Sequence, residues 1–387
     1  MSLTETPRTQ HPEPEPIAAE RLTVEGGVMA YRLHDVGYEL DLDRAFQLLA
    51  PEAPSRAHPV RDEAKALLVK NPPLSLVLGT ETLDSSVGRV TAEVSARLYD
   101  FGVLSVRLAA RCGGSLPWPE YAAFASSVER CALRESALSR HLEPLLARLR
   151  PAIDRPRLAP VSEDYMILRV DRLVTRDGSP VATARLRDQD LAALVLDESR
   201  ELSRFAQRDL IPHRLSYYAD DLAVLAWERA LVIEPDPRNA DVEYVLEFAN
   251  AQLLELRVYD DLLDAELPRI YTRVAHARAR FAHRFRRRYG QLLAEIQTQV
   301  ADVTEVVERT ENAFRVTDDV YLARVYSAAM DVFRGRSWRA GVDRKLEIIR
   351  QTYAMLNAES QSARAEILEV AIVVLIVAEI LLAAFRP

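Results

Sequence analysis

The segment Gly88–Cys112, GRVTAEVSARLYDFGVLSVRLAARC, predicts the fold of the first half of the chain. Its first part alternates apolar and polar residues, the apolar ones being Val90, Ala92, Val94, Ala96 and Leu98. Alternation with a period of two is typical of a β-strand with one buried face. A second apolar run follows Asp100-Phe101-Gly102, and Asp and Gly favour a tight turn. The segment therefore predicts a β-hairpin.

Further strand and helix signals flank this hairpin between residues 20 and 237. The run DYMILRV (164–170) predicts a strand, and HRLSYYADDLAVLAWERALVIEP (213–235) predicts a second hairpin that turns at Asp220-Asp221. Helices are predicted from Pro119 to about Leu149, with a break near Arg134, and from Asp188 to Leu210. We therefore expect an α+β domain at 20–237. A disordered tail at 1–19, rich in proline and polar residues, precedes it.

After Pro235 and Pro237 the apolar residues follow helical spacing. In EYVLEFANAQLLELRVYDDLLD (243–264) they recur every three or four positions, at Leu246, Ala249, Leu253, Leu256 and Leu263. We expect long antiparallel helices, arranged as a coiled coil, over 238–364, with breaks at Gly290, Gly335 and Gly341. Asn250 and Gln252 interrupt the apolar pattern, and a buried amide can fix the register of paired helices. These two residues are therefore candidates for setting register and oligomeric state.

The last segment, RAEILEVAIVVLIVAEILLAAFRP (364–387), has thirteen Ile, Leu, Val or Phe residues between Ile367 and Phe385. Such residues favour membrane insertion by about 4–8 kcal/mol in total, and Glu379, which lies off-centre, opposes it by about 3 kcal/mol or less. The balance predicts a transmembrane helix at 365–387, which would be a single-pass anchor in the bacterial inner membrane with the bulk of the chain cytoplasmic. The alternative is a buried helix in an oligomer core. Glu379 needs a polar neighbour and is a third candidate oligomer residue.

Three segments together resemble one known family. RLYDFGVLSVRL (97–108), VLEFANAQLLELRVYDDLLD (245–264) and RAEILEVAIVVLIVAEILL (364–382) resemble the required-for-meiotic-nuclear-division family, also called YagE-like. The resemblance implies a bacterial member with an α+β domain, a helical region and a C-terminal membrane helix. Mitochondrial members of that family are associated with the inner membrane and organellar translation, and form large homo-oligomers. The resemblance therefore also implies self-association.

The sequence lacks the motifs that several kinds of site require. The two cysteines, Cys112 and Cys131, provide neither a disulfide framework nor a zinc-ligand spacing. The chain contains no GxGxxG, P-loop or GxSxG motif. The net charge of -8 gives no general attraction to nucleic acid. We therefore expect no catalytic residue, no cofactor and no small-molecule substrate.

Acidic residues raise one alternative. Asp260, Asp261 and Asp264 fall within one turn of a predicted helix, and carboxylates at this spacing can share a divalent cation. A metal-dependent hydrolase is therefore the alternative function. A di-metal helical bundle would add a Glu-x-x-His step, which is missing. We expect these acids to be solvated or paired with arginine.

The segment from Leu267 to Ala294 carries eight arginines and no acid. Five arginines form a stripe at helical spacing: Arg269, Arg273, Arg280, Arg284 and Arg287. Three interpretations stay open. The stripe can pair with the acidic residues that follow, bind the headgroups of anionic lipids, or contact the phosphates of RNA or a ribosome.

These observations predict a membrane-anchored, self-associating scaffold or tether that faces the cytoplasm and carries out no catalysis. Its expected partners are further copies of itself and membrane lipid. A tether that binds RNA or the ribosome through the arginine stripe is a further hypothesis.

Overall fold

The computed structural model describes residues 15–52, 54–56, 67–69, 71–135, 137–198, 200, 202–203, 205, 213–279, 298, 314–316 and 320–384. The chain divides into two compact units. The first unit comprises Met1–Glu255 and Glu311–Gly335, and the second comprises Leu256–Thr310 and Arg336–Pro387. Each unit is described by itself.

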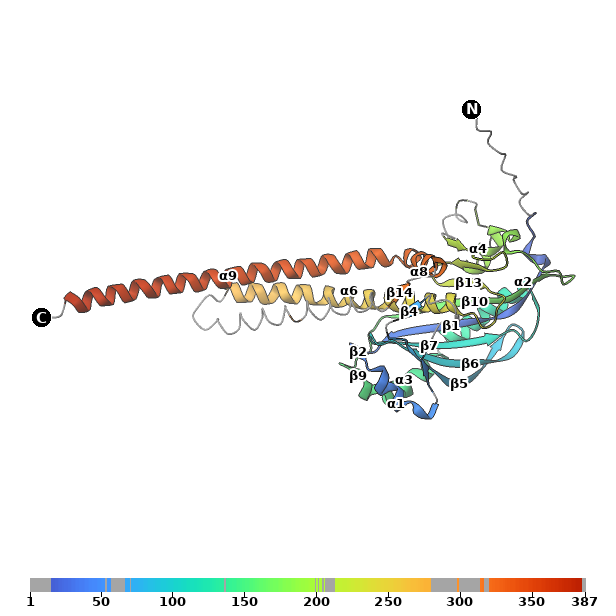
Figure 1. Ribbon diagram of the computed structural model, residues 1–387, viewed down its shortest axis with the longest axis horizontal. Helices are drawn as coiled ribbons and strands as arrows, with labels where there is room; N and C mark the ends of the chain where they lie inside the picture. The colour runs from blue at the N-terminus through green and yellow to red at the C-terminus, as the bar shows by residue number, and fades with distance from the viewer. Residues whose placement is uncertain are drawn as a thin grey trace, which may run out of the picture. The chain divides into compact units, whose positions relative to one another are not determined.

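The described part of the first unit is built on a ten-stranded mixed sheet (Figure 1). Its strands lie in the order β11 (His213–Leu215), β12 (Leu222–Leu225), β13 (Arg229–Ile233), β10 (Ser162–Thr175), β1 (Leu22–Asp35), β7 (Val103–Arg111), β6 (Gly88–Leu98), β5 (Leu74–Ser85) and β3 (Ser55–Arg56). The short strand β8 (Leu116–Pro117) also pairs with β1. Neighbouring strands are antiparallel except β10 and β13, which are parallel.

The strands predicted from apolar alternation are confirmed. β6 and β7 form the expected hairpin around Tyr99–Gly102, β10 contains the run at 164–170, and β11 pairs with β12 across a turn that includes Asp220-Asp221. The predicted strand residues Ala92, Val94, Ala96 and Leu98 are all buried. The alternation therefore identified the inner face of this hairpin correctly.

Helices cover the face of the sheet that carries the larger apolar core. They are α2 (Trp118–Glu129), which continues as a π-helical turn over Arg130–Arg134, then α3 (Ser139–Leu149) and α4 (Asp188–Leu196). The predicted break near Arg134 is confirmed. The predicted helix from Asp188 ends early, because Asp197 adopts a left-handed conformation (φ 54°) that terminates it. Shorter 3₁₀ turns lie at Ala19–Arg21, Ala50–Glu52, Arg150–Ala152 and Thr183–Arg185.

The opposite face of the sheet is covered by the start of α6 (Asp241–Ala279) and by α8 (Val320–Val332). The ring of Phe248 in α6 lies 5.9 Å from that of Tyr99, and the ring of Phe333 lies 5.4 Å from that of Tyr165. Every residue from 241 to 255 is buried. This stretch of α6 is therefore an interior helix of the α+β unit.

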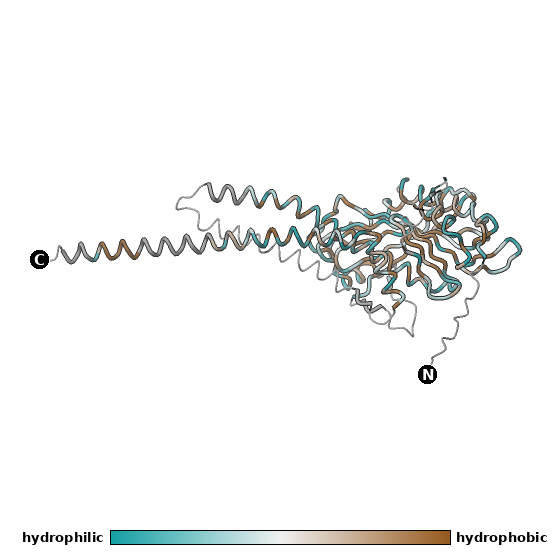
Figure 2. Tube along the Cα trace, turned by 90° about the horizontal axis from the view of Figure 1, so that it is seen from above, coloured by the Kyte–Doolittle hydropathy of each residue, from teal (hydrophilic) through white to brown (hydrophobic). Residues whose placement is uncertain are grey.

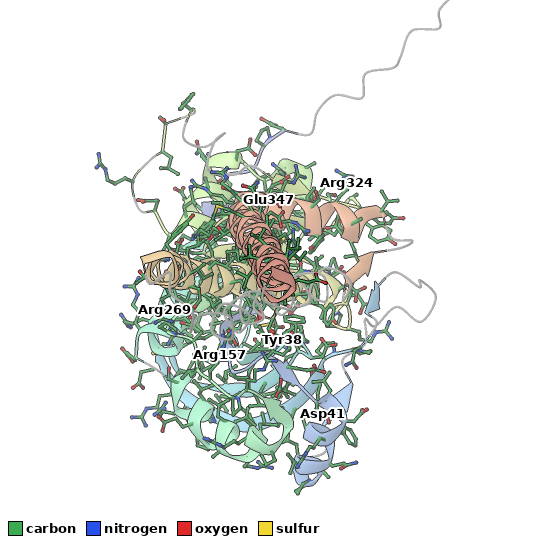
Figure 3. The ribbon with its side chains drawn as sticks, turned by 90° about the vertical axis from the view of Figure 1, so that its left-hand side faces the viewer. Tyr38, Asp41, Arg157, Arg269, Arg324 and Glu347 are labelled. Carbon is green, nitrogen blue, oxygen red and sulfur yellow. The ribbon has the colours of Figure 1, made fainter. Side chains whose placement is uncertain are left out.

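Two separate two-stranded sheets accompany the main sheet. Strand β2 (Glu39–Leu40) pairs with β9 (Ile153–Asp154), and β14 (Phe314–Val316) pairs with β4 (Leu67–Val69). Arg157 reaches the buried carboxylate of Asp35 at 2.7 Å, close to Tyr38 (Figure 3). Asp41 caps α1 (Leu42–Leu48) by accepting two backbone N–H bonds.

In the second unit the remainder of α6 pairs with α9 (Gly335–Ala384). Arg257 lies over the ring of Trp338 at 5.7 Å, and Lys345 binds Asp260 and Asp264 at 2.7 and 2.6 Å. Arg257 on α6 contacts Trp338 on α9, and the later Asp264 contacts the later Lys345. Helices α6 and α9 are therefore parallel.

The predicted coiled coil is wrong for the described residues, whereas the antiparallel partner expected directly after α6 and the break expected at Gly290 lie outside them. Leu246, Ala249 and Leu253, which suggested a helix–helix seam, are buried within the α+β unit instead. The other positions of this stretch include carboxylates and amides that are buried with polar partners, so the apolar residues keep the spacing of a seam although the helix is enclosed, which explains the error. Gly335 marks a helix start as expected, whereas Gly341 lies inside α9.

The expected transmembrane helix at 365–387 is also wrong, and with it the fold class and the single-pass location in the inner membrane. Among the described residues, no helix combines the length and apolar character that crossing a membrane requires. Glu369 and Glu379 confine the uninterrupted apolar run to nine residues, 370–378. Such a run rises about 14 Å, less than half of a hydrocarbon core of about 30 Å. Figure 2 shows part of this run as a hydrophobic segment of α9.

We predict that Gly102→Ala destabilises the protein by about 2–4 kcal/mol. Gly102 has φ 88°, and a Cβ atom there would lie 2.0 Å from the carbonyl oxygen of Gly37. Gly113 is the matched control, because a Cβ atom at that position meets no atom within 4 Å. Urea unfolding measures both variants. A Gly102→Ala protein as stable as Gly113→Ala would contradict the assigned turn.

Candidate functional site

The sheet face beneath α6 carries a buried ionic layer. Arg97 on β6 and Arg107 on β7 approach the same carboxylate oxygen of Glu247, with nitrogen–oxygen distances of 2.5 and 3.6 Å. Cross-strand pairing places Arg97 opposite Ser105 and Arg107 opposite Ser95, so the two arginines are diagonal neighbours on one face. The Glu247 side chain is only 1% exposed. Two cations and one anion thus share a largely buried space.

Burial and Glu247 act in opposite directions on these arginines. Burial lowers the pKa of Arg97, but the attraction of Glu247 together with the smaller contributions of Tyr99 and Tyr244 outweighs it, and the pKa lies above its usual value. At Arg107 burial prevails over the more distant carboxylate, so the pKa is lowered. Arginine nevertheless stays protonated at neutral pH. Burial also raises the pKa of Tyr99 well above its usual value, so this hydroxyl stays protonated at neutral pH.

A second set of polar contacts continues the layer along α6. Arg169 on β10 pairs with Glu243 and with Asp171, and donates to the carbonyls of Glu234, Asp236 and Asn239 in the loop before α6. The start of α6 and its preceding loop are therefore fixed to the sheet by one guanidinium group.

The two amides predicted to set helix register lie in this region. Asn250 donates hydrogen bonds to the hydroxyl of Tyr31 and to the carbonyl of Leu246, both at 3.0 Å. Gln252 accepts a hydrogen bond from the hydroxyl of Tyr326 on α8. Both amides are buried within the α+β unit. Their proposed role in oligomer register stays a prediction.

The structure describes only part of the arginine stripe. Arg269 lies on α6 with its side chain 64% exposed and pairs with Glu266 at 2.5 Å. Arg273 belongs to the same helix, but its side chain lies outside the described residues, as do Arg280, Arg284 and Arg287 altogether. Glu379, on α9, has an exposed side chain. The functions expected of these residues stay predictions.

Two of the carboxylates considered for metal binding form ion pairs with one lysine. Lys345 lies between Asp260 and Asp264, within 2.7 Å of an oxygen of each. A divalent cation at this position would have to displace the lysine. Within the described ranges, no group of three or more His, Cys, Asp or Glu side chains is placed to hold a metal ion.

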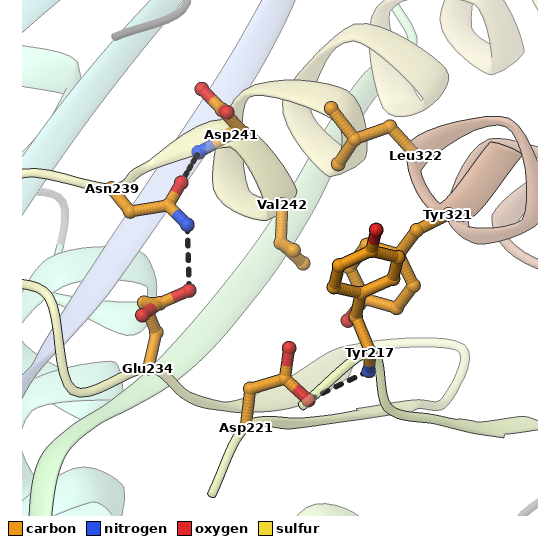
Figure 4. A pocket seen from close by; sticks show the side chains of 8 residues that line it. All are labelled: Tyr217, Asp221, Glu234, Asn239, Asp241, Val242, Tyr321 and Leu322. Atoms are coloured by element: carbon orange, nitrogen blue, oxygen red, sulfur yellow. Dashed lines mark hydrogen bonds between the residues drawn. The ribbon is translucent and has the colours of Figure 1, made fainter. Parts of the chain in front are cut away.

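A pocket opens where the loop before β12, the loop before α6 and the start of α8 meet (Figure 4). Its cavity volume is about 10 Å³, and the rest of the hollow is open to solvent. The described residues that line it are Tyr217, Asp221, Glu234, Asn239, Asp241, Val242, Tyr321 and Leu322. Burial raises the pKa of Glu234, and the nearby Asp221 carboxylate adds to this. The pocket thus concentrates negative charge beside aromatic rings.

Comparison with known proteins identifies the family. The family described as "Uncharacterized protein MJ0711, N-terminal domain" matches residues 25–240, more than half of the chain. The chain belongs to the MJ0711 N-terminal domain family. The uncharacterized protein MJ0711 of Methanocaldococcus jannaschii is 24% identical over 193 residues. The match covers 50% of this chain and 58% of that relative, so the chain spans less than two thirds of the relative's length. No solved structure matches.

The expected membership of the required-for-meiotic-nuclear-division family is therefore wrong. The MJ0711 match ends at residue 240, just before α6 begins. Two of the three segments behind the earlier resemblance, at 245–264 and 364–382, lie beyond this end. They are apolar helical segments, and such segments look alike in unrelated proteins.

Sequence reasoning missed Arg97, Arg107 and Glu247. The arginines occupy the polar positions of the alternating strand pattern, which predicts exposure to solvent. One signal was present. Glu243 and Glu247 stand four residues apart on one side of a helix, and the strands carry arginines on their supposedly exposed face. Matching these opposite charges would have suggested that α6 covers the sheet.

We predict that Glu247→Gln destabilises the protein by about 3–5 kcal/mol, because it leaves two buried guanidinium groups without their anion. Asp84→Asn is the control. Asp84 pairs with Arg89 while both side chains are more than 80% exposed, and such pairs contribute about 0–1 kcal/mol. The free energy of unfolding in urea measures both. Equal losses in the two variants would show that the buried layer is not a major source of stability.

Proposed function

We propose that this protein is a non-catalytic, self-associating scaffold that assembles through the aliphatic segment Ile372–Val377 of α9. One observation carries the proposal. Six consecutive large aliphatic residues in this segment are each at least 50% exposed: Ile372, Val373, Val374, Leu375, Ile376 and Val377. Six consecutive positions cover more than a full helical turn, so the segment is apolar on all sides. A helix that is apolar all round is normally enclosed by other elements.

Energy considerations favour more than two copies. Burying the exposed half of six aliphatic side chains contributes about 5–9 kcal/mol per chain. One partner helix covers only one side and gains about half of this, whereas association costs about 4–15 kcal/mol. A pair of helices is therefore marginal, and a bundle of three or more segments buries much more.

Identical copies are suited to cover one another. Each copy offers an aliphatic run of the same length, bounded by Glu369 and Glu379. Aligned runs keep these carboxylates at the ends of the bundle, where water can solvate them. A scaffold assembled in this way would display several α+β units, which is the basis for proposing a structural role.

We predict that the full chain sediments as an oligomer of at least three copies at micromolar concentration, and that Leu375→Glu weakens this assembly at least about tenfold. Leu375 is the most exposed residue of the segment at 68%, so the substitution should leave the fold of each chain intact. Analytical ultracentrifugation over a concentration series measures the change.

Leu158→Glu is the matched control, since Leu158 is an exposed leucine (53%) far along the chain from α9. It should assemble like the unaltered protein. The proposal fails if the unaltered chain stays monomeric at the highest concentration, or if Leu375→Glu and Leu158→Glu sediment alike.

A further inference from the structure

The pocket of Figure 4 has an excess of carboxylate groups. Asp221, Glu234 and Asp241 are the charged side chains among its described lining residues, and that lining includes no base. Arg169 lies behind the loop and contacts main-chain carbonyls of Glu234 and Asp236, but Glu243 and Asp171 already pair with its charge. The pocket therefore attracts a cation.

Asp221 has an unused acceptor that faces this space. The residue is only 5% exposed. Its Oδ1 accepts hydrogen bonds from the backbone N–H groups of Tyr217 and Tyr218, at 2.8 and 2.9 Å. Its Oδ2 accepts no hydrogen bond within the described part of the chain, and it points into the pocket in Figure 4. This oxygen stays in contact with solvent although the residue is largely buried, so a charged donor at this position can form a charge-assisted hydrogen bond with it.

The remaining walls are aromatic and aliphatic. The rings of Tyr217 and Tyr321 lie 5.6 Å apart at the mouth, and Val242 and Leu322 close the inner side. Tyrosine faces attract cations, and guanidinium groups stack on them. Aliphatic side chains instead pack against the methylene stem that carries such a head group.

These walls discriminate between kinds of cation. A metal ion needs several oxygens within about 2.0–2.6 Å of one point, and the described carboxylates are not grouped in this way. An alkylammonium or alkylguanidinium ion has a larger head and an apolar stem. It can therefore use both the carboxylates and the tyrosine rings.

We infer that this pocket binds an organic cation, an alkylguanidinium or alkylammonium group, with its head at Asp221 Oδ2 and its stem against Tyr217 and Tyr321. A basic side chain of another protein and a free polyamine share this chemistry. The site is independent of the α9 assembly, because all of its lining residues belong to the α+β unit.

Calorimetric titration of the full chain tests the inference. The probes are capped Gly-Arg-Gly and Gly-Lys-Gly peptides, spermidine, and capped Gly-Gln-Gly as the uncharged comparison. At least one cationic probe should bind saturably, and the glutamine peptide should not. Tighter binding of a peptide than of spermidine would indicate a protein side chain as the source, and the reverse order would indicate a polyamine.

Asp221→Asn should weaken binding at least about tenfold. The asparagine oxygen can still accept the two backbone hydrogen bonds, so the loop keeps its shape while the charge is lost. Tyr217→Leu provides a second variant, because its side chain is 60% exposed and its loss should weaken binding without unfolding the protein.

Asp220→Asn is the matched control, as it removes the same charge from the neighbouring residue, which does not line the pocket. It should change affinity less than about twofold. The inference is overturned if no cationic probe binds saturably, or if Asp220→Asn weakens binding as much as Asp221→Asn.

Discussion

The ion pair between Arg97 and Glu247 is the contact on which the arrangement of the α+β unit depends. Residues 241–255 of α6 are buried on every side, although they include four carboxylates and two amides. Charges in such a position are tolerated only when cations and hydrogen-bond partners accompany them. The sheet supplies Arg97 and Arg107 for Glu247 and Arg169 for Glu243. Only this face of the sheet can therefore receive the helix.

The region matched by the family ends just before the helix that makes this contact. The region matched by the MJ0711 N-terminal domain, residues 25–240, contains the strands that carry the three arginines. The acids lie on α6, which begins at the next residue. The sheet thus provides a basic surface, and the helix that follows neutralises it and continues into the second unit. The same helix positions Asp241 and Val242 in the proposed cation pocket, so its anchoring also shapes that site.

Local sequence patterns predicted where strands and helices occur better than they predicted which of these elements pack together. The alternation in β6 and the turn at Gly102 depend on neighbouring residues and were readable from the sequence. The other face of the same strands was predicted wrongly. Polar residues at alternate positions indicate a solvent-exposed face, but here a helix with carboxylate side chains covers that face. The apolar spacing of α6 has the same appearance in a coiled-coil seam and in an interior helix. The acids Asp260 and Asp264 were expected to be solvated or paired with arginine, yet their partner is Lys345, about 80 residues further along the chain, a distance that no local pattern bridges.

Native-state hydrogen exchange tests most directly whether the start of α6 is an interior element of the α+β unit. If it is, the amides of Val245–Gln252 should exchange only through global unfolding, with the same opening free energy as those of Leu104–Ala110 in β7. The amides of Val258–Tyr271, in the second unit, provide the internal comparison. The account is contradicted if Val245–Gln252 open as readily as Val258–Tyr271 while β7 stays protected, because α6 would then be a peripheral helix that the buried arginines do not hold.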